Sequence, residues 1–168
     1  MRSLLFLIPL ILVAGPAAAA PRHILATPRD GGAGFSIAIP PGLVRQDVRG
    51  IDSEVSAFEG EGIALSFDYG WYSAILSCEA VKESCAERRE TVGGRTAHVV
   101  EAQWPFDEGR GHRRYVGLLF ELGGPVRLSA SATCVDERAC ARALDVLRTI
   151  AFEGGEPPPA ATPETPRW

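Results

Sequence analysis

The chain has 168 residues, of which 46% are hydrophobic and 23% are charged, and its formal net charge at pH 7 is -4. This mildly acidic balance argues against nucleic acid and against an anionic membrane surface as partners, because both attract basic proteins. The length suffices for one hydrophobic core of ordinary size, and the sequence shows no sign of a second domain.

The N-terminal segment is typical of a signal peptide. Arg2 supplies a positive charge, an apolar stretch follows at residues 4–13, and residues 17–19 are alanines of the kind that signal peptidases recognise. We therefore expect residues 1–19 to be removed and the protein to be periplasmic or secreted, with no membrane span after cleavage. An uncleaved anchor is the open alternative, because residues 3–20 carry no charge over nearly the length of a spanning helix.

The next part of the chain predicts several short strands. Residues 20–33 contain prolines and glycines without periodicity, so we expect a mobile leader there. Apolar side chains then alternate with polar or small ones, which predicts strands at residues 35–39, 43–48, 53–59 and 63–69.

The C-terminal half predicts a β-hairpin and one helix. Residues 75–91 show no clear periodicity, and a strand is expected at residues 95–104. Two alternating segments, residues 116–122 and 126–133, flank a Gly-Gly pair and predict a hairpin with a two-residue turn. Asp136 is a suitable N-cap for the helix that follows, whose apolar residues recur with helical spacing.

This order of elements predicts one α+β domain over residues 34–153. Its antiparallel strands share one apolar face, and we expect the C-terminal helix to pack on that sheet. Residues 154–168 contain five prolines, so we expect a disordered tail that is partly polyproline II.

Three segments resemble PsbP-like and Mog-type domains. Residues 35–42 are similar to the opening strand and proline turn of that family, residues 91–97 to the start of its central hairpin, and residues 144–152 to its closing helix. The resemblance covers residues 34–152. It implies an antiparallel sheet flanked by helices, and a protein that acts by binding other proteins rather than by chemistry. No functional residue of the family maps onto this chain.

The four cysteines are expected to form disulfides. An even number of cysteines in an exported chain favours structural bonds over catalytic thiols. We favour the pairs Cys78–Cys85 and Cys134–Cys140, because each closes a short loop within one local segment. Neither pair has the spacing of a redox motif or of a zinc site, so we expect no metal and no cofactor.

Two groups of residues are candidate binding sites. Tyr69, Trp71 and Tyr72 surround a glycine at a strand end and resemble the aromatic anchors of protein interfaces, although packing against the core is the more usual role of aromatic residues at a strand end. The basic residues of the second group suit an acidic partner or a phosphate, although a solvated loop balanced by its own carboxylates is the simpler interpretation. This second group consists of Arg110, Arg113 and Arg114.

No catalytic motif accompanies these sites, so we expect a protein that is not an enzyme. The leading hypothesis is an exported accessory or binding domain that contacts another envelope protein. A small ligand-binding protein or hydrolase, with a site assembled from dispersed residues, is one alternative. An inhibitor of an exported enzyme is another. A pocket with convergent titratable groups would favour an enzyme, and an exposed aromatic patch would favour a binding domain.

Overall fold

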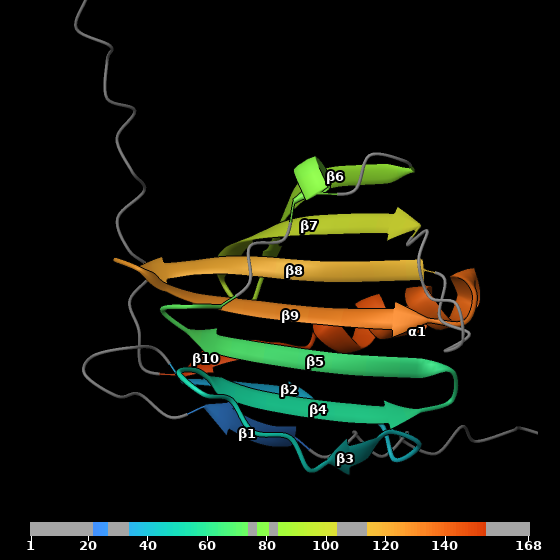
Figure 1. Ribbon diagram of the computed structural model, residues 1–168, viewed down its shortest axis with the longest axis horizontal. Helices are drawn as coiled ribbons and strands as arrows, with labels where there is room; N and C mark the ends of the chain where they lie inside the picture. The colour runs from blue at the N-terminus through green and yellow to red at the C-terminus, as the bar shows by residue number, and fades with distance from the viewer. Residues whose placement is uncertain (1–21, 27–33, 74–76, 81–83, 104–113, 154–168) are drawn as a thin grey trace, which may run out of the picture.

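The computed structural model describes the parts of the chain that fold into one β-rich domain (Figure 1). The expected signal peptide (1–19) and the expected proline-rich tail (154–168) lie outside these parts. The described residues are 22–26, 34–73, 77–80, 84–103 and 114–153.

A seven-stranded sheet, antiparallel throughout, forms the larger layer of the fold. Its centre is the pairing of β5 with β9, which joins an N-terminal meander to a C-terminal one. Tight turns with glycines at positive φ connect β4 to β5, β6 to β7 and β8 to β9. The strands in spatial order are β3 (Val44–Gln46), β4 (Glu54–Gly60), β5 (Ile63–Gly70), β9 (Val126–Cys134), β8 (Arg114–Gly123), β7 (Arg95–Gln103) and β6 (Cys85–Val92).

A smaller sheet of three strands covers part of one face of the larger sheet. It consists of β1 (Arg22–Ala26), β2 (Gly34–Ala38) and β10 (Ala151–Glu153), with β2 in the middle. Both pairings are antiparallel. The paired strands β2 and β10 lie near opposite ends of the domain sequence. Strand β1 lies within the leader for which we expected no regular structure.

One α-helix, α1 (Glu137–Leu147), packs on the same face beside the smaller sheet. The Asp136 carboxylate accepts a hydrogen bond of 2.7 Å from the Ala139 backbone N–H, as the N-cap prediction requires. Ala139 and Ala143 are buried against the sheet, and their small side chains let the helix lie close to β8 and β9. The Cys134–Cys140 disulfide joins the end of β9 to the first turns of this helix.

The hydrophobic core lies between the large sheet and these covering elements. Alternate residues of β5, β8 and β9 point into it, and the ring of Phe35 on β2 contacts the rings of Phe67 and Tyr69 on β5. Phe152 on β10 packs edge-on against Phe120 on β8, with ring centroids 5.0 Å apart. Aromatic contacts therefore fasten the small sheet to the large one.

The expected fold class, an α+β domain with an antiparallel sheet flanked by helices, is wrong. About 60% of the structure is strand and 13% is helix, so the domain is β-rich. The main reason is that a second sheet covers the inner face where helices were expected. In addition, the C-terminal part of residues 75–91, for which the sequence shows no clear periodicity, lies in the exposed edge strand β6. The chain also contributes a short 3-10 helix, η1 (Cys78–Ala80), which lies beside β6.

Candidate functional site

The three aromatic residues near the end of β5 divide into one core residue and two surface residues. Tyr69 is only 8% exposed, and its ring lies 6.0 Å from that of Phe35. Burial raises the pKa of its hydroxyl, with a further contribution from the Glu54 carboxylate and an opposing one from Arg95. The interpretation of Tyr69 as a binding residue therefore has no support in its position, which is that of a core side chain.

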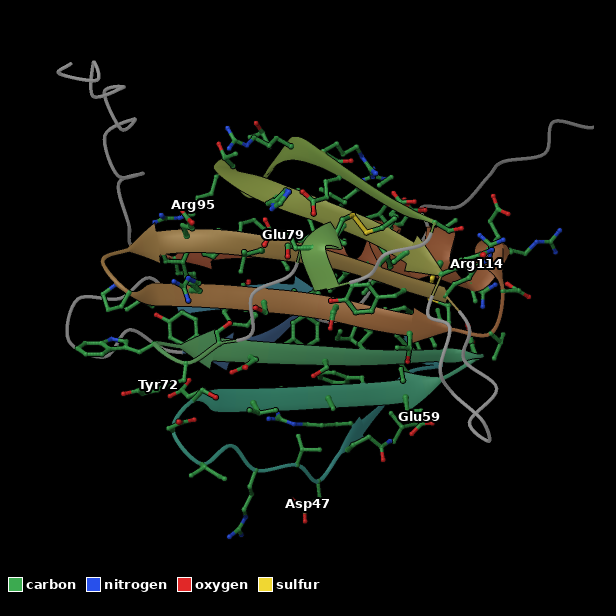
Figure 2. The ribbon with its side chains drawn as sticks, turned by 45° about the horizontal axis from the view of Figure 1, so that its top comes forward. Asp47, Glu59, Tyr72, Glu79, Arg95 and Arg114 are labelled. Carbon is green, nitrogen blue, oxygen red and sulfur yellow. A yellow bond between two sulfur atoms is a disulfide. The ribbon has the colours of Figure 1, made fainter. Side chains whose placement is uncertain are left out.

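Trp71 and Tyr72 are displayed at the surface. The exposed fractions of their side chains are 62% and 71%. These fractions are high, because large aromatic side chains are usually mostly buried in folded proteins. They form the turn that follows β5, and Figure 2 shows Tyr72 at the extreme end of the large sheet. Neither ring caps the core, so the packing interpretation that explains Tyr69 does not extend to them.

The fold fixes this turn from both sides. Before it, Gly70 has a φ of +155°, and a Cβ at that position would lie 3.1 Å from the Cβ of Ser53, so a larger residue would be strained there. After it, Ser73 is buried, and its hydroxyl lies 2.7 Å from the hydroxyl of Ser129 on β9. The two exposed rings are thus carried on a short, anchored segment.

A third exposed apolar side chain lies at the same end. The contact of Gly70 with Ser53 and Asp52 places residues 52–53 beside the turn, and Ile51 precedes them with a fully exposed side chain. We call Ile51, Trp71 and Tyr72 the aromatic patch. Sequence analysis missed Ile51, although an isoleucine between charged residues of a glycine-containing loop was a signal for an exposed apolar group.

The basic candidate residues lie elsewhere. Arg114 opens β8, and Figure 2 shows it at the opposite end of the sheet from Tyr72. Its guanidinium lies 3.5 Å from the Glu137 carboxylate at the start of α1. Arg110 and Arg113 lie outside the described residues. The structure therefore does not bring Arg114 and the aromatic patch into one site.

A cleft of about 390 Å³ lies beside Arg114, between α1 and the strands β6 to β8. Its charged side chains are already engaged in ion pairs: Arg114 with Glu137, and Glu101 with Arg88. The lining consists of Ser84, Ala86, Glu101, Ala102, Gln103, Arg114, Tyr115, Val116, Glu137, Cys140, Ala141 and Leu144.

An ionic network next to this cleft joins β6 to Arg148, the residue that caps the C-terminus of α1. Two nitrogens of Arg148 lie 2.8 and 3.0 Å from the Glu90 carboxylate, and Arg88 donates to the same carboxylate at 2.8 Å. The hydrogen bond from Arg148 is the main reason that the pKa of Glu90 falls to about 2, and Arg88 adds to the effect. This arrangement stabilises the fold and leaves no free group for chemistry at Glu90.

His98 has a different partner from the carboxylate nearest to it in sequence. Its Nε2 atom lies 3.0 Å from Glu87 Oε2 on the neighbouring strand β6. Glu101, three residues further along β7, is hydrogen-bonded to Arg88 instead. His98 and Glu101 therefore do not form an acid–base pair, because residues three apart in a strand lie on opposite faces of the sheet.

The four cysteines form the two local disulfides that we favoured, Cys78–Cys85 and Cys134–Cys140. Within the described ranges, no cluster of three or more histidine, cysteine, aspartate or glutamate side chains is placed to hold a metal ion. The same ranges contain no helix whose length and apolar character would let it cross a bilayer.

Comparisons with protein-family models, with curated proteins and with solved structures gave no match to this chain. The resemblance to PsbP-like and Mog-type domains therefore stays a prediction from the sequence segments that carry it. Inference about function has to proceed from the aromatic patch and the cleft themselves.

Proposed function

We propose that this protein is an exported accessory or binding domain that acts by contact with another protein of the cell envelope, through the aromatic patch. The supporting observation is the exposure of Trp71 and Tyr72 on a turn that Gly70 and the Ser73–Ser129 hydrogen bond hold in place. Tryptophan and tyrosine contribute most strongly to protein interfaces, and a fixed turn presents them with little loss of conformational entropy on binding.

The disulfides support the exported part of this proposal. Two cysteine pairs closed as disulfides suggest an oxidising, exported environment, since cytosolic thiols are kept reduced. The finer assignment, to a periplasm or to the extracellular medium, depends on residues 1–19 acting as a cleaved signal peptide. An N-terminal sequence of the exported protein that begins near residue 20 would support that assignment.

The cleft beside Arg114 favours a second candidate function, a small ligand-binding protein. Its volume suits a small molecule, and it has polar side chains on both walls. A charged ligand would have to displace the ion pair of Arg114 with Glu137, which counts against this alternative.

That the protein is not an enzyme also stays a prediction. An inhibitor of an exported enzyme would be a particular case of the first proposal, with that enzyme as partner.

Crosslinking in the native envelope tests the proposal. Wild-type protein and the Trp71→Ala/Tyr72→Ala variant are captured in parallel, with Val44→Ala as a control for an exposed apolar residue outside the patch. We expect one envelope protein to be enriched with wild type and with the control, and lost with the double variant. Equal enrichment with all three proteins, or enrichment with none, would reject the aromatic patch as a binding site.

A further inference from the structure

The chain leaves the described fold at the end that carries the aromatic patch. On β10, Phe152 packs against Phe120, with ring centroids 5.0 Å apart. Phe120 and Tyr69 lie in the same row across the sheet, because both pair with Leu128. Tyr69 is two residues before Trp71, and Figure 1 shows β10 and the C-terminal end of β5 on the same side of the molecule. The residues after β10 therefore start close to the patch.

The residues that follow β10 have the composition of a proline-rich peptide of the kind that binds to exposed aromatic rings. Five of residues 154–168 are prolines, and Pro163 and Pro166 form a P-x-x-P motif with Arg167 directly after it. A polyproline II helix has three residues per turn, so two prolines with this spacing lie on one side of it. Fifteen residues in this conformation reach about 45 Å, at roughly 3.1 Å per residue, which exceeds the width of a small domain.

The aromatic patch has the complementary chemistry. Proline-rich helices bind to surfaces lined by exposed aromatic rings, because the stiff ligand loses little entropy when the prolines pack against the ring faces. Trp71 and Tyr72 supply two such rings. Asp52 is exposed beside them, with its backbone oxygen 3.7 Å from the Cβ position of Gly70, and its carboxylate suits a basic residue after the prolines.

We propose that residues 163–167 bind to the aromatic patch of the same molecule as a polyproline II segment. Pro163 and Pro166 pack against the two rings of the patch, and Arg167 pairs with Asp52. The inference rests on the proposed function, since both assign the patch to protein contact. It adds that an envelope partner has to displace this segment before it binds.

Amide NMR spectra of the purified exported protein, with residues 154–168 present, test the contact. The Pro163→Ala/Pro166→Ala variant disrupts the motif, and Pro157→Ala/Pro158→Ala is the matched control outside it. We expect the first variant to shift the indole N–H of Trp71 and the amides of Tyr72 and Asp52, and the control to leave them in place. Unchanged spectra in both variants would overturn the inference. Shifts that grow with protein concentration would also overturn it, because they indicate binding between two copies.

A charge exchange tests the orientation of the segment. We expect Arg167→Glu to shift the indole N–H of Trp71 and the amide of Tyr72, and Asp52→Arg in the same chain to restore the wild-type positions of these two resonances. Failure of Asp52→Arg to restore them would reject this orientation.

The failure of this inference is distinguishable from the failure of the proposed function. If the proline variants leave the spectra unchanged while partner capture still requires Trp71 and Tyr72, only the intramolecular contact is wrong. If the segment binds but no partner is captured, the proposed function is wrong.

Discussion

Ser73 and Ser129 share a hydrogen bond of 2.7 Å between two buried hydroxyls that lie 56 residues apart in sequence. The bond ties the turn after β5 to the centre of the large sheet. Because of it, the neighbouring Trp71 and Tyr72 are exposed on an ordered segment rather than on a loose loop. The hydrogen bond distinguishes this turn from the frayed end of a strand, because it holds the two exposed rings on an ordered backbone. It is the structural basis of the proposed binding site.

The first prediction concerns this bond. Ser73→Ala should lower the free energy of unfolding by about 1 kcal/mol, the usual net value of a buried hydrogen bond. It should also weaken partner capture, because the turn loses an anchor. Combined with Ser129→Ala, it should cost less than the sum of the single changes, since both remove the same bond. Urea unfolding measures the three values, with Ser66→Ala on the exposed part of β5 as control. Strict additivity would contradict the shared bond.

The second prediction separates the core aromatic from the exposed ones. Tyr69→Ala should cost about 3 kcal/mol, because it removes a buried ring that packs against Phe35. Trp71→Ala and Tyr72→Ala should each change stability by less than about 0.5 kcal/mol, because their side chains are largely exposed. Thermal unfolding of the three variants tests the contrast. A loss of several kcal/mol for Trp71→Ala would show that this ring supports the core and would remove it from the binding site.

The third prediction concerns a buried cation. Arg95 is 7% exposed, its guanidinium lies 5.0 Å from the centroid of the Phe152 ring, and its Nη1 atom has no hydrogen-bond partner among the described residues. Burying a charge without full hydrogen bonding is costly. Arg95→Met keeps the long apolar stem and removes the charge, so stability should stay equal or rise by about 1 kcal/mol. Denaturant unfolding provides the measurement, and a loss of more than about 2 kcal/mol would show that the charge is compensated within the fold.

The fourth prediction is a pH dependence set by Glu90. Its pKa in the folded protein is about 2, against an ordinary value of 4.5, because Arg148 and Arg88 bind the charged carboxylate. A lowered pKa adds stability that is present above pH 4.5 and is lost as the pH falls toward 2. Glu90→Gln should therefore cost about 1 kcal/mol at neutral pH, a modest value because the pairs are partly exposed.

Unfolding free energies between pH 7 and pH 2 provide the measurement for Glu90. The wild-type curve should fall more steeply than that of Glu90→Gln over the acid range, and the two curves should converge at the acid end. Glu59→Gln, at an exposed position on β4, is the control and should follow the wild type. Parallel curves for wild type and Glu90→Gln would show that the network with Arg148 contributes nothing to folding.

Sequence patterns predicted the parts of the fold whose pairing is local. Strand β5 has four apolar residues on one face, and the hairpin of β8 and β9 has a glycine pair at its turn, so both were visible from periodicity. Strand β6 was not, because it is an edge strand whose central residues are all charged and mostly exposed, which removes the alternation. The pairing of Ser36 with Ala151 joins distant segments, and no local pattern specifies such a contact.

The sequence predicted only part of the candidate site, again because local patterns do not specify contacts between distant segments. Aromatic residues at a strand end drew attention to Trp71 and Tyr72, but only burial distinguishes them from Tyr69. Ile51 belongs with them because the residues after it lie beside Gly70, a tertiary relationship that the sequence does not state. The glutamate that neutralises Arg114 likewise comes from α1, a different element of the fold.

A photoreactive amino acid at position 72 tests the central claim most directly. It is introduced into the exported protein in living cells, with position 59, exposed at the other end of β4, as the matched control. The account predicts an adduct with one envelope protein from position 72, none from position 59, and loss of the adduct when Trp71→Ala is added to a chain that still folds. No adduct from position 72, or an adduct unaffected by Trp71→Ala, would contradict the aromatic patch as the binding site.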